Sequence, residues 1–172
     1  MYIGNRNFDL ENSAYVCGIL NVTPDSFSDG GCFNNIDAAL FHTEEMIKEG
    51  ASLIDIGGES TRPGYVMISD DEEIERVIPI IRAVKERFDI PVSLDTYKVG
   101  VAEAGLDAGA DMINDIWGLM YNCETSDSNV FTSPMAKLLA AADVPCCLMH
   151  NKSNTEYNNF LIDMLSETQE CV

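Results

Sequence analysis

Five short apolar runs in the sequence each finish at a polar side chain that is able to bind a ligand. These side chains belong to Asn21, Asp55, Asp95, Asn114 and His150. Because parallel strands end at the same edge of a sheet, we expect the five side chains to lie close together. A carboxylate accepts hydrogen bonds and an amide both donates and accepts them, so Asp and Asn together suit a flat heterocycle with amino, ring N–H and carbonyl groups. The sequence therefore predicts a binding site for such a ring.

Motifs for several other chemistries are missing from the sequence. It has no G-x-S-x-G motif, no P-loop and no Cys/His pair at a useful spacing, and Gly57 with Gly58 does not make a dinucleotide fingerprint. The residues after this glycine pair offer backbone N–H groups, Ser60, Thr61 and Arg62 to an anion. Arg62 by itself would equally fit a solvated surface residue. We therefore expect a site that binds and stabilises charge, and not one built on a nucleophile or a base.

The chain is strongly acidic. Its 172 residues include 10 Lys and Arg against 29 Asp and Glu, which gives a formal net charge of −19. Such a surface repels phosphate backbones and anionic lipids, so we expect small-molecule substrates as partners and neither nucleic acid nor membrane. No apolar run approaches the roughly 20 residues that span a bilayer, and the polar N-terminus lacks the features of a secretory signal. Six cysteines without a C-x-x-C pair are typical of free thiols, so we expect a cytoplasmic protein.

The apolar runs alternate with segments of helical periodicity. Strand-like runs lie at residues 15–20, 53–56, 91–94, 112–113 and 145–149, and helical patterns lie at 36–47, 69–84, 98–106, 133–142 and 154–169. This alternation with short connections indicates a parallel α/β sheet. Ser69 is expected to cap the second helix, and Pro79 to kink or shorten it. The stretch 50–55 is echoed at 109–114, which suits a (β/α) barrel, and the polar stretch 121–131 is interpreted as a surface insertion.

The motifs at the strand ends resemble those of dihydropteroate synthases. GILNVTPDSFSDGG at residues 18–31 and DIGGESTRPG at residues 55–64 match two long family signatures, and shorter matches follow in the same order at 93–96, 113–116 and 148–150. The resemblance implies a (β/α)8 TIM barrel of the pterin-binding group with an N-terminal hairpin. A complete barrel takes about 250 residues. We therefore expect residues 1–172 to form a single pterin-binding barrel domain that is C-terminally incomplete, with the first five strands and about four and a half helices.

The resemblance also implies an activity and the residues that carry it. The family condenses 6-hydroxymethyl-7,8-dihydropterin diphosphate with 4-aminobenzoate in folate biosynthesis and releases pyrophosphate. By resemblance, Asp55, Asp95, Asn114, Ile116 and Met149 would bind the pterin, Asn21, Thr61 and Arg62 the diphosphate, and Phe27, Thr61 and Pro63 the aminobenzoate, where sulfonamides compete. Asn21 would contact Mg²⁺, the expected cofactor. Asp95, Asn21 and Arg62 are the expected catalytic residues, and the complete enzyme is expected to be a homodimer.

The family's later motifs are absent from these 172 residues. In the family they supply a second pterin carboxylate, a lysine near the pterin carbonyl and most cations for the pyrophosphate, whereas here only Arg62 and Lys98 are expected near the site. Two other interpretations therefore remain open. One is a methyltetrahydrofolate–corrinoid methyltransferase, although the intact loop signatures argue against it. The other is a non-catalytic remnant that binds a pterin without turnover.

Overall fold

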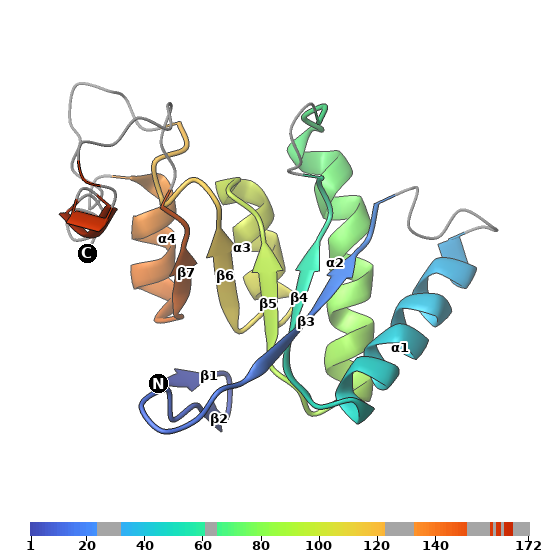
Figure 1. Ribbon diagram of the computed structural model, residues 1–172. Coiled ribbons are helices and arrows are strands. Elements are labelled where there is room, and N and C mark those ends of the chain that lie inside the picture. Colours follow the sequence, from blue (N-terminus) through green and yellow to red (C-terminus); the bar gives the residue numbers. More distant parts are fainter. Residues whose placement is uncertain are drawn as a thin grey trace.

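The computed structural model describes residues 1–23, 32–60, 65–122, 133–150, 159, 161–162 and 164–166 (Figure 1). Its strands are β1 (Tyr2–Ile3), β2 (Arg6–Asn7), β3 (Val16–Asn21), β4 (Ala51–Gly57), β5 (Val92–Asp95), β6 (Met112–Asp115) and β7 (Cys146–Leu148). Its helices are α1 (Cys32–Lys48), α2 (Asp70–Arg87), α3 (Val99–Asp107) and α4 (Pro134–Ala142). The predicted alternation of strands and helices is therefore confirmed.

The main sheet is parallel and its strands lie side by side in the order in which they follow in the chain, β3-β4-β5-β6-β7. Crossovers between parallel strands are right-handed, so an order without reversal places every connecting helix on one face of the sheet. Figure 1 shows α1 to α4 on that one face, and the antiparallel β1–β2 hairpin below the amino ends of the strands. A doubly wound sheet would reverse its strand order. The arrangement is that of a partial (β/α) barrel with an N-terminal hairpin, as predicted.

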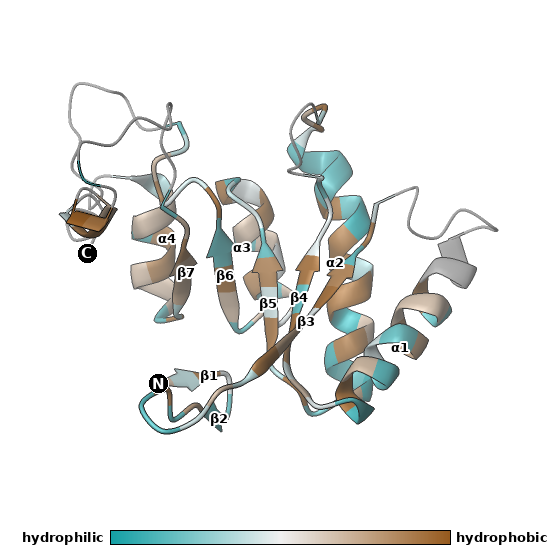
Figure 2. Ribbon diagram, in the orientation of Figure 1, coloured by the Kyte–Doolittle hydropathy of each residue, from teal (hydrophilic) through white to brown (hydrophobic). Residues whose placement is uncertain are grey.

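The core lies between the sheet and its helices. Alternate strand residues point toward the helices, and Ile54, Ile56, Leu94 and Ile113 are fully buried there. Figure 2 shows the apolar stripe that α2 turns toward the sheet. At Gly105 of α3 the helix approaches β5 so closely that a Cβ atom would overlap Cδ2 of Leu94. This packing fixes the distance between helices and strands, and so fixes the position of the strand ends.

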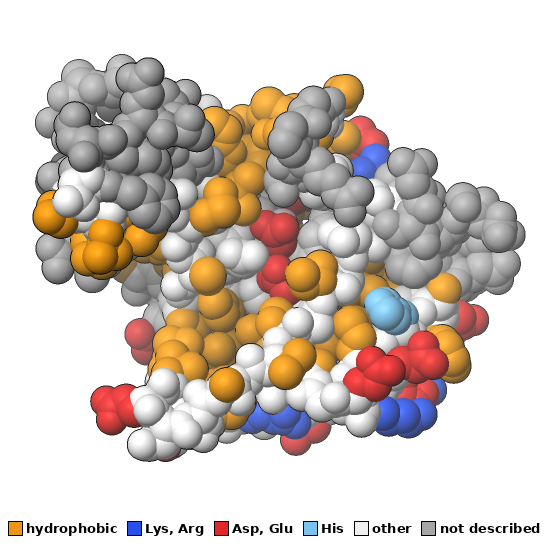
Figure 3. Space-filling view, viewed as in Figure 1, with side chains coloured by type: hydrophobic (Ala, Val, Ile, Leu, Met, Phe, Trp, Pro, Cys, Tyr) orange, Lys and Arg blue, Asp and Glu red, His pale blue; other side chains and the backbone are white. Residues whose placement is uncertain are grey.

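The opposite face of the sheet carries no helix among the described residues. Along β3, Cys17, Ile19 and Asn21 are exposed while Gly18 and Leu20 are buried, and Ile19 keeps 63% of its surface exposed. Figure 3 shows apolar side chains over much of this face and acidic side chains near its centre. In a closed (β/α)8 barrel this face lines the interior.

Several local predictions are confirmed, and the predicted shortening of the second helix at Pro79 is wrong. Ser69 caps α2, because its Oγ accepts a 3.2 Å hydrogen bond from the backbone N–H of Glu72. Gly50 and Gly109, the first residues of the two echoed stretches, both have positive φ angles of 109° and 107°. Pro79 does not shorten α2, which continues to Arg87. Pro79 is exposed, so the helix carbonyl that loses its N–H partner can bond water instead.

Two predictions extend beyond the described residues. Of the helix predicted at 154–169, residues 161–162 and 164–166 are helical, Asn159 lies in a bend, and the rest lie outside the described residues. The predicted insertion at 121–131 is described only at Tyr121 and Asn122, which lie in a turn; its other residues lie outside the described part. Among the helices described, none has both the length and the hydropathy that crossing a membrane requires.

Candidate functional site

The strand register brings three of the predicted polar side chains, those of Asn21, Asp95 and Asn114, into one row at the carboxyl edge of the sheet. Asn21 pairs with Gly57, Gly57 pairs with Asp95, and Asp95 pairs with Asn114. A Cβ atom on Gly57 would lie 3.4 Å from Oδ2 of Asp95 and 3.7 Å from Oδ1 of Asn21. The side chains of Asn21 and Asp95 therefore both border the space that a side chain at position 57 would fill. Asp55 lies two residues earlier on β4 and points to the same face.

A side-chain hydrogen bond links Asp55 to Asn114 across the intervening strand β5. Nδ2 of Asn114 donates to Oδ2 of Asp55 at 3.0 Å. Oδ1 of Asp55 is buried and has no hydrogen-bond partner among the described residues. A buried acceptor without a donor costs about 1–3 kcal/mol. The site thus holds a carboxylate oxygen that a ligand N–H group would satisfy.

Asp95 is the most perturbed acid of this row. Burial, together with the negative charges of Asp55, Glu73 and Asp115, raises its pKa from 3.8 to about 7. Its carboxyl group is therefore close to half-protonated at neutral pH. Such a site disfavours anions and favours ligands that donate hydrogen bonds or carry positive charge.

The surroundings of the cysteines on this face disfavour their thiolate forms. Burial and the nearby charge of Asp55 raise the pKa of the Cys17 thiol to about 11. Burial and the charges of Asp55 and Asp95 also raise the pKa of Cys147. Because the thiolate is the reactive form, a raised pKa lowers the share of reactive thiolate at neutral pH.

Lys98 lies near the site, but it is not available to a ligand. Its side chain is 3% exposed, and its Nζ lies 2.6 Å from Oε2 of Glu59 and 2.7 Å from Oε2 of Glu73. Lys98 therefore adds no free cation for a ligand, because two buried carboxylates neutralise its charge. The sequence contained one indication that Lys98, Glu59 and Glu73 would be buried together. Glu73 shares the buried stripe of α2 with Val77 and Ile80, and a carboxylate in such a stripe requires a buried partner.

Some of the predicted site residues lie close together in the structure, and others lie outside the described residues. Asn21, Asp55, Asp95 and Asn114 lie together, as described above. Ile116 follows β6 directly, and Met149 follows β7, is 45% exposed and donates its backbone N–H to the carbonyl oxygen of Asp115 at 3.1 Å. The predicted ligand contacts of these six residues remain predictions. The predictions for Phe27, Thr61, Arg62 and Pro63 lie outside the described residues.

The side chains at the carboxyl edge of the sheet can be compared with the ligands that the predicted magnesium ion would need. Within the described part of the chain, no group of three or more His, Cys, Asp and Glu side chains is arranged to hold a metal. Mg²⁺ keeps several waters and often takes only one or two protein ligands besides substrate phosphates. The exposed amide oxygen of Asn21 fits that limited role. The residues present therefore suit an ion that arrives with a diphosphate.

Comparison with known proteins gives the same family throughout. The sequence profile described as "Pterin binding enzyme" matches residues 17–171. A dihydropteroate synthase from Clostridium beijerinckii is 55% identical over 172 residues, which cover all of this chain and 60% of that relative. A dihydropteroate synthase from Bacillus subtilis is 50% identical over 157 residues, 91% of this chain and 52% of the relative. The chain thus spans little more than half the length of these curated relatives.

Solved structures match at similar coverage. A dihydropteroate synthase from Clostridium difficile, crystallised in the presence of pteroic acid, superposes with a TM-score of 0.77 at 44% identity, over 96% of this chain and 62% of that one. The Yersinia pestis dihydropteroate synthase in a sulfonamide drug complex superposes with a TM-score of 0.73 at 42% identity, over 91% and 55% of the two chains. Both matches support the barrel assignment.

Proposed function

The chain belongs to the family of pterin binding enzymes, and we propose that its strands form the pterin site of a dihydropteroate synthase. The proposed reaction joins 6-hydroxymethyl-7,8-dihydropterin diphosphate to 4-aminobenzoate and gives 7,8-dihydropteroate and pyrophosphate. The observation that carries the proposal is the buried oxygen of Asp55, which lacks a donor among the described residues and lies beside Asn114 in the same row as Asp95. A pterin ring supplies N–H donors and a carbonyl acceptor for such a group of side chains.

The acidic site also suits the proposed chemistry. When the diphosphate leaves the pterin methylene, positive charge develops and spreads into the ring. Asp95 and Asp55 stabilise that charge, because they are partly buried and already in place before the reaction. The aniline nitrogen of 4-aminobenzoate then attacks the methylene carbon and loses a proton to water. No nucleophilic side chain is needed for this reaction.

The diphosphate and aminobenzoate contacts are proposed from the family resemblance. Asn21, Thr61 and Arg62 are proposed to bind the diphosphate, and Phe27, Thr61 and Pro63 the aminobenzoate. Mg²⁺ supplies positive charge to the departing pyrophosphate when it is bound, and Asn21 is the residue proposed to contact it. The sulfonamide complex of the Yersinia pestis relative supports an aminobenzoate site that such drugs can occupy.

The setting of the enzyme is proposed on the same grounds. We propose a single pterin-binding domain over residues 1–172, a cytoplasmic location and a homodimer of the complete enzyme. The acidic composition, with a net charge of −19, supports small molecules as partners and not nucleic acid or anionic membranes.

Ordered ligand binding tests the proposed function. The natural protein that contains these residues is titrated calorimetrically with a dihydropterin, with 4-aminobenzoate, and with 4-aminobenzoate after pyrophosphate and Mg²⁺. We expect the pterin to bind alone and 4-aminobenzoate to bind only once pyrophosphate is present. Release of pyrophosphate from the diphosphate substrate must accompany product formation. Pterin binding without any turnover would indicate the non-catalytic alternative, and methyl transfer from methyltetrahydrofolate to a corrinoid would indicate the methyltransferase.

A further inference from the structure

A buried carboxylate folds the turn that follows β6. Asp115 is the last residue of this strand and is fully buried. Its Oδ1 accepts a 2.8 Å hydrogen bond from the backbone N–H of Trp117, and its Oδ2 accepts a 2.9 Å hydrogen bond from the backbone N–H of Leu119. The backbone carbonyl oxygen of Asp115 accepts a further bond, from the N–H of Gly118 at 3.2 Å. The backbone N–H groups of residues 117, 118 and 119 are therefore all bound to Asp115.

The turn contains two consecutive residues in the left-handed region of backbone conformation. The φ angle is 57° at Gly118 and 69° at Leu119. A residue with a Cβ atom adopts such an angle only when the surrounding contacts hold it there. The bond from Leu119 to the carboxylate of Asp115 is such a contact. Strained backbone of this kind is concentrated at functional sites, so the conformation of this turn points to a role beyond packing.

The same turn holds the residue that follows β7. The backbone N–H of Met149 donates a 3.1 Å hydrogen bond to the carbonyl oxygen of Asp115. A Cβ atom on Gly118 would lie 2.9 Å from the carbonyl oxygen of Met149, so glycine allows the turn to approach this closely. Ile116 lies between Asp115 and Trp117, which the carboxylate joins. Asp115 therefore fixes the backbone at Ile116 and at Met149, the two apolar residues expected to bind the pterin.

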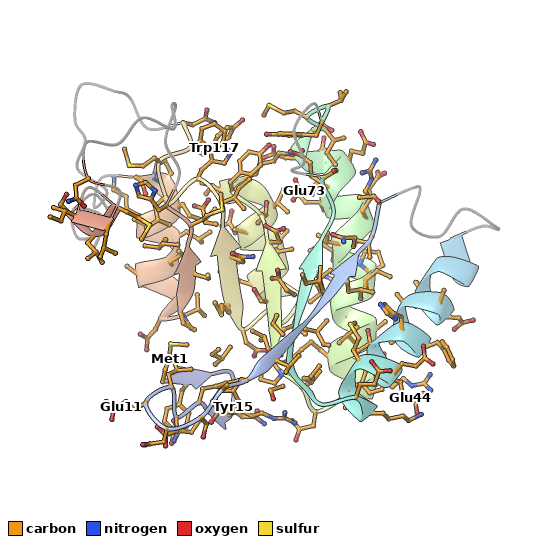
Figure 4. The ribbon with its side chains drawn as sticks, in the orientation of Figure 1. Met1, Glu11, Tyr15, Glu44, Glu73 and Trp117 are labelled. Atoms are coloured by element: carbon orange, nitrogen blue, oxygen red, sulfur yellow. The ribbon has the colours of Figure 1, made fainter. Side chains whose placement is uncertain are left out.

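The turn also lies beside the connection that follows β5. The ring centroid of Trp117 is 6.1 Å from that of Tyr97, which stands two residues after Asp95 in the sequence. Figure 4 shows Trp117 beyond the carboxyl end of β6. The negative charge of Asp115 is also close enough to Asp95 to contribute to its raised pKa. The turn therefore belongs to the surroundings of the polar row at the carboxyl edge.

We propose that Asp115 is a positioning residue of the pterin site, whose carboxylate folds the turn so that Ile116 and Met149 border the row of Asp95 and Asn114. This inference rests on the proposed function and adds to it a residue that makes no ligand contact, because Asp115 is fully buried and both of its oxygens accept hydrogen bonds. A pocket for a flat ring needs apolar side chains against the ring as well as polar groups that orient it. Loss of the carboxylate should therefore weaken pterin binding and leave the sheet folded.

Amide hydrogen exchange tests the positioning step without a ligand. Asp115→Asn keeps one acceptor oxygen and replaces the other by an amide nitrogen, which cannot accept a hydrogen bond. In the natural protein that contains these residues, we expect exchange in the peptide 116–120 to become about tenfold faster. Gly118→Ala, which pushes the turn away from Met149, should change exchange in the same direction if Asp115→Asn does not fold. Unchanged exchange would overturn the proposal.

Asp111→Asn is the matched control for this experiment. Asp111 lies directly before β6, so the same substitution is made at the opposite end of the same strand. Oδ2 of Asp111 accepts hydrogen bonds from Nζ of Lys85 at 2.7 Å and from the backbone N–H of Val92 at 2.8 Å. The control therefore also weakens a carboxylate that binds a backbone N–H. We expect exchange in the peptide 116–120 to stay within about twofold of the native rate.

Calorimetric titration with a dihydropterin tests the link to the ligand. We expect Asp115→Asn to raise the Kd about tenfold and Asp111→Asn to leave it within about twofold. Both variants lose a buried acceptor, so a general loss of stability would affect them alike. A native Kd in Asp115→Asn, or an equal loss of affinity in both variants, would contradict the positioning role.

A double-mutant cycle tests whether Asp115 acts through the two apolar residues. In a protein that already carries Ile116→Ala and Met149→Ala, the side chains that Asp115 is proposed to position are gone. Asp115→Asn should then raise the Kd by no more than about twofold, because residues that act through the same contact are not additive. A full tenfold loss in this background would refute the positioning role while the proposed function stands. Absence of pterin binding by the native protein would refute the proposed function itself and this role with it.

Discussion

Asn114 donates a 3.0 Å hydrogen bond to Asp55, although the two residues are 59 positions apart and strand β5 lies between their strands. Residues on alternate strands meet in this way when a parallel sheet curves into a barrel, because alternate strands contribute side chains to the same interior layer. The bond fixes both side chains, and the second oxygen of Asp55 has no partner within the described part of the chain. A site for a hydrogen-bond donor follows from that one contact.

Replacement of Asp95 by Asn should weaken pterin binding selectively. Hydrogen bonds to a charged group contribute about 1.5–3 kcal/mol, so Asp95→Asn should lower the affinity for a dihydropterin by about 10- to 100-fold. Calorimetric titration measures this change. Asp71→Asn removes a carboxylate from an exposed position of α2 and serves as the control. An unchanged affinity in Asp95→Asn would contradict the assignment of this residue to the pterin site.

The raised pKa of Asp95 predicts a pH-dependent stability. Because its folded value of about 7 exceeds the ordinary value of 3.8, its contribution is fully present below pH ~4 and is lost as the pH rises through 7. Asp95→Asn has no carboxyl group at this position and therefore does not lose stability in this way. We expect the Tm difference, variant minus native protein, to be about 3–6 °C larger at pH 8 than at pH 4. Thermal unfolding at both pH values measures the difference, and a difference independent of pH would show that Asp95 does not titrate in this range.

An added carboxylate at position 114 should disrupt the site. Asn114→Asp removes the N–H donor to Asp55 and places a negative charge in register with Asp95. Loss of the buried hydrogen bond and repulsion between like charges should together destabilise the protein by about 2–4 kcal/mol. Denaturant unfolding measures this, with Asn122→Asp at an exposed turn as the control. Equal stability of the two variants would argue against a tight Asp55–Asn114 contact.

Two glycines of α3 should respond in opposite ways to alanine. Gly105→Ala forces a methyl group onto Leu94, and overpacking of this kind costs about 1–3 kcal/mol. Gly100→Ala places its Cβ only 3.1 Å from Oδ2 of Asp70, but Asp70 is exposed and its carboxylate can move. That variant should gain about 0.5–1 kcal/mol of helix propensity. Urea unfolding of both variants checks the pair, and a similar effect at both positions would contradict the close approach of α3 to β5.

The predicted role of Arg62 is tested by its own substitution. Arg62→Ala should lower kcat/KM for the diphosphate substrate about 100-fold, because a charged partner of the leaving group is lost, and leave binding of a free dihydropterin unchanged. Steady-state kinetics and titration separate the two effects. Equal losses in both would place Arg62 at the pterin ring and not at the diphosphate.

Much of the fold is evident from local sequence patterns. The strand at residues 15–20 and the helix start at Ser69 were predictable because a strand's apolar run and a helix cap each depend on a few neighbouring residues. The shortening predicted at Pro79 was wrong because the cost of this proline depends on whether the freed carbonyl faces solvent, which depends on how the helix packs. The polar strand ends Asn21, Asp95 and Asn114 were predictable as a group, because parallel strands share one carboxyl edge.

The sequence by itself determined the order of strands and helices, the acidic character and the polar residues at the strand ends. Only the tertiary structure decided which of these residues touch. The strand register brought Asn114 within hydrogen-bond distance of Asp55, and the packing of α2 buried Lys98 between Glu59 and Glu73. Both results depend on contacts between residues far apart in the chain. Burial and pairing decide whether a side chain is charged and whether a ligand can reach it. The residues next to that side chain in the sequence determine neither its burial nor its partner.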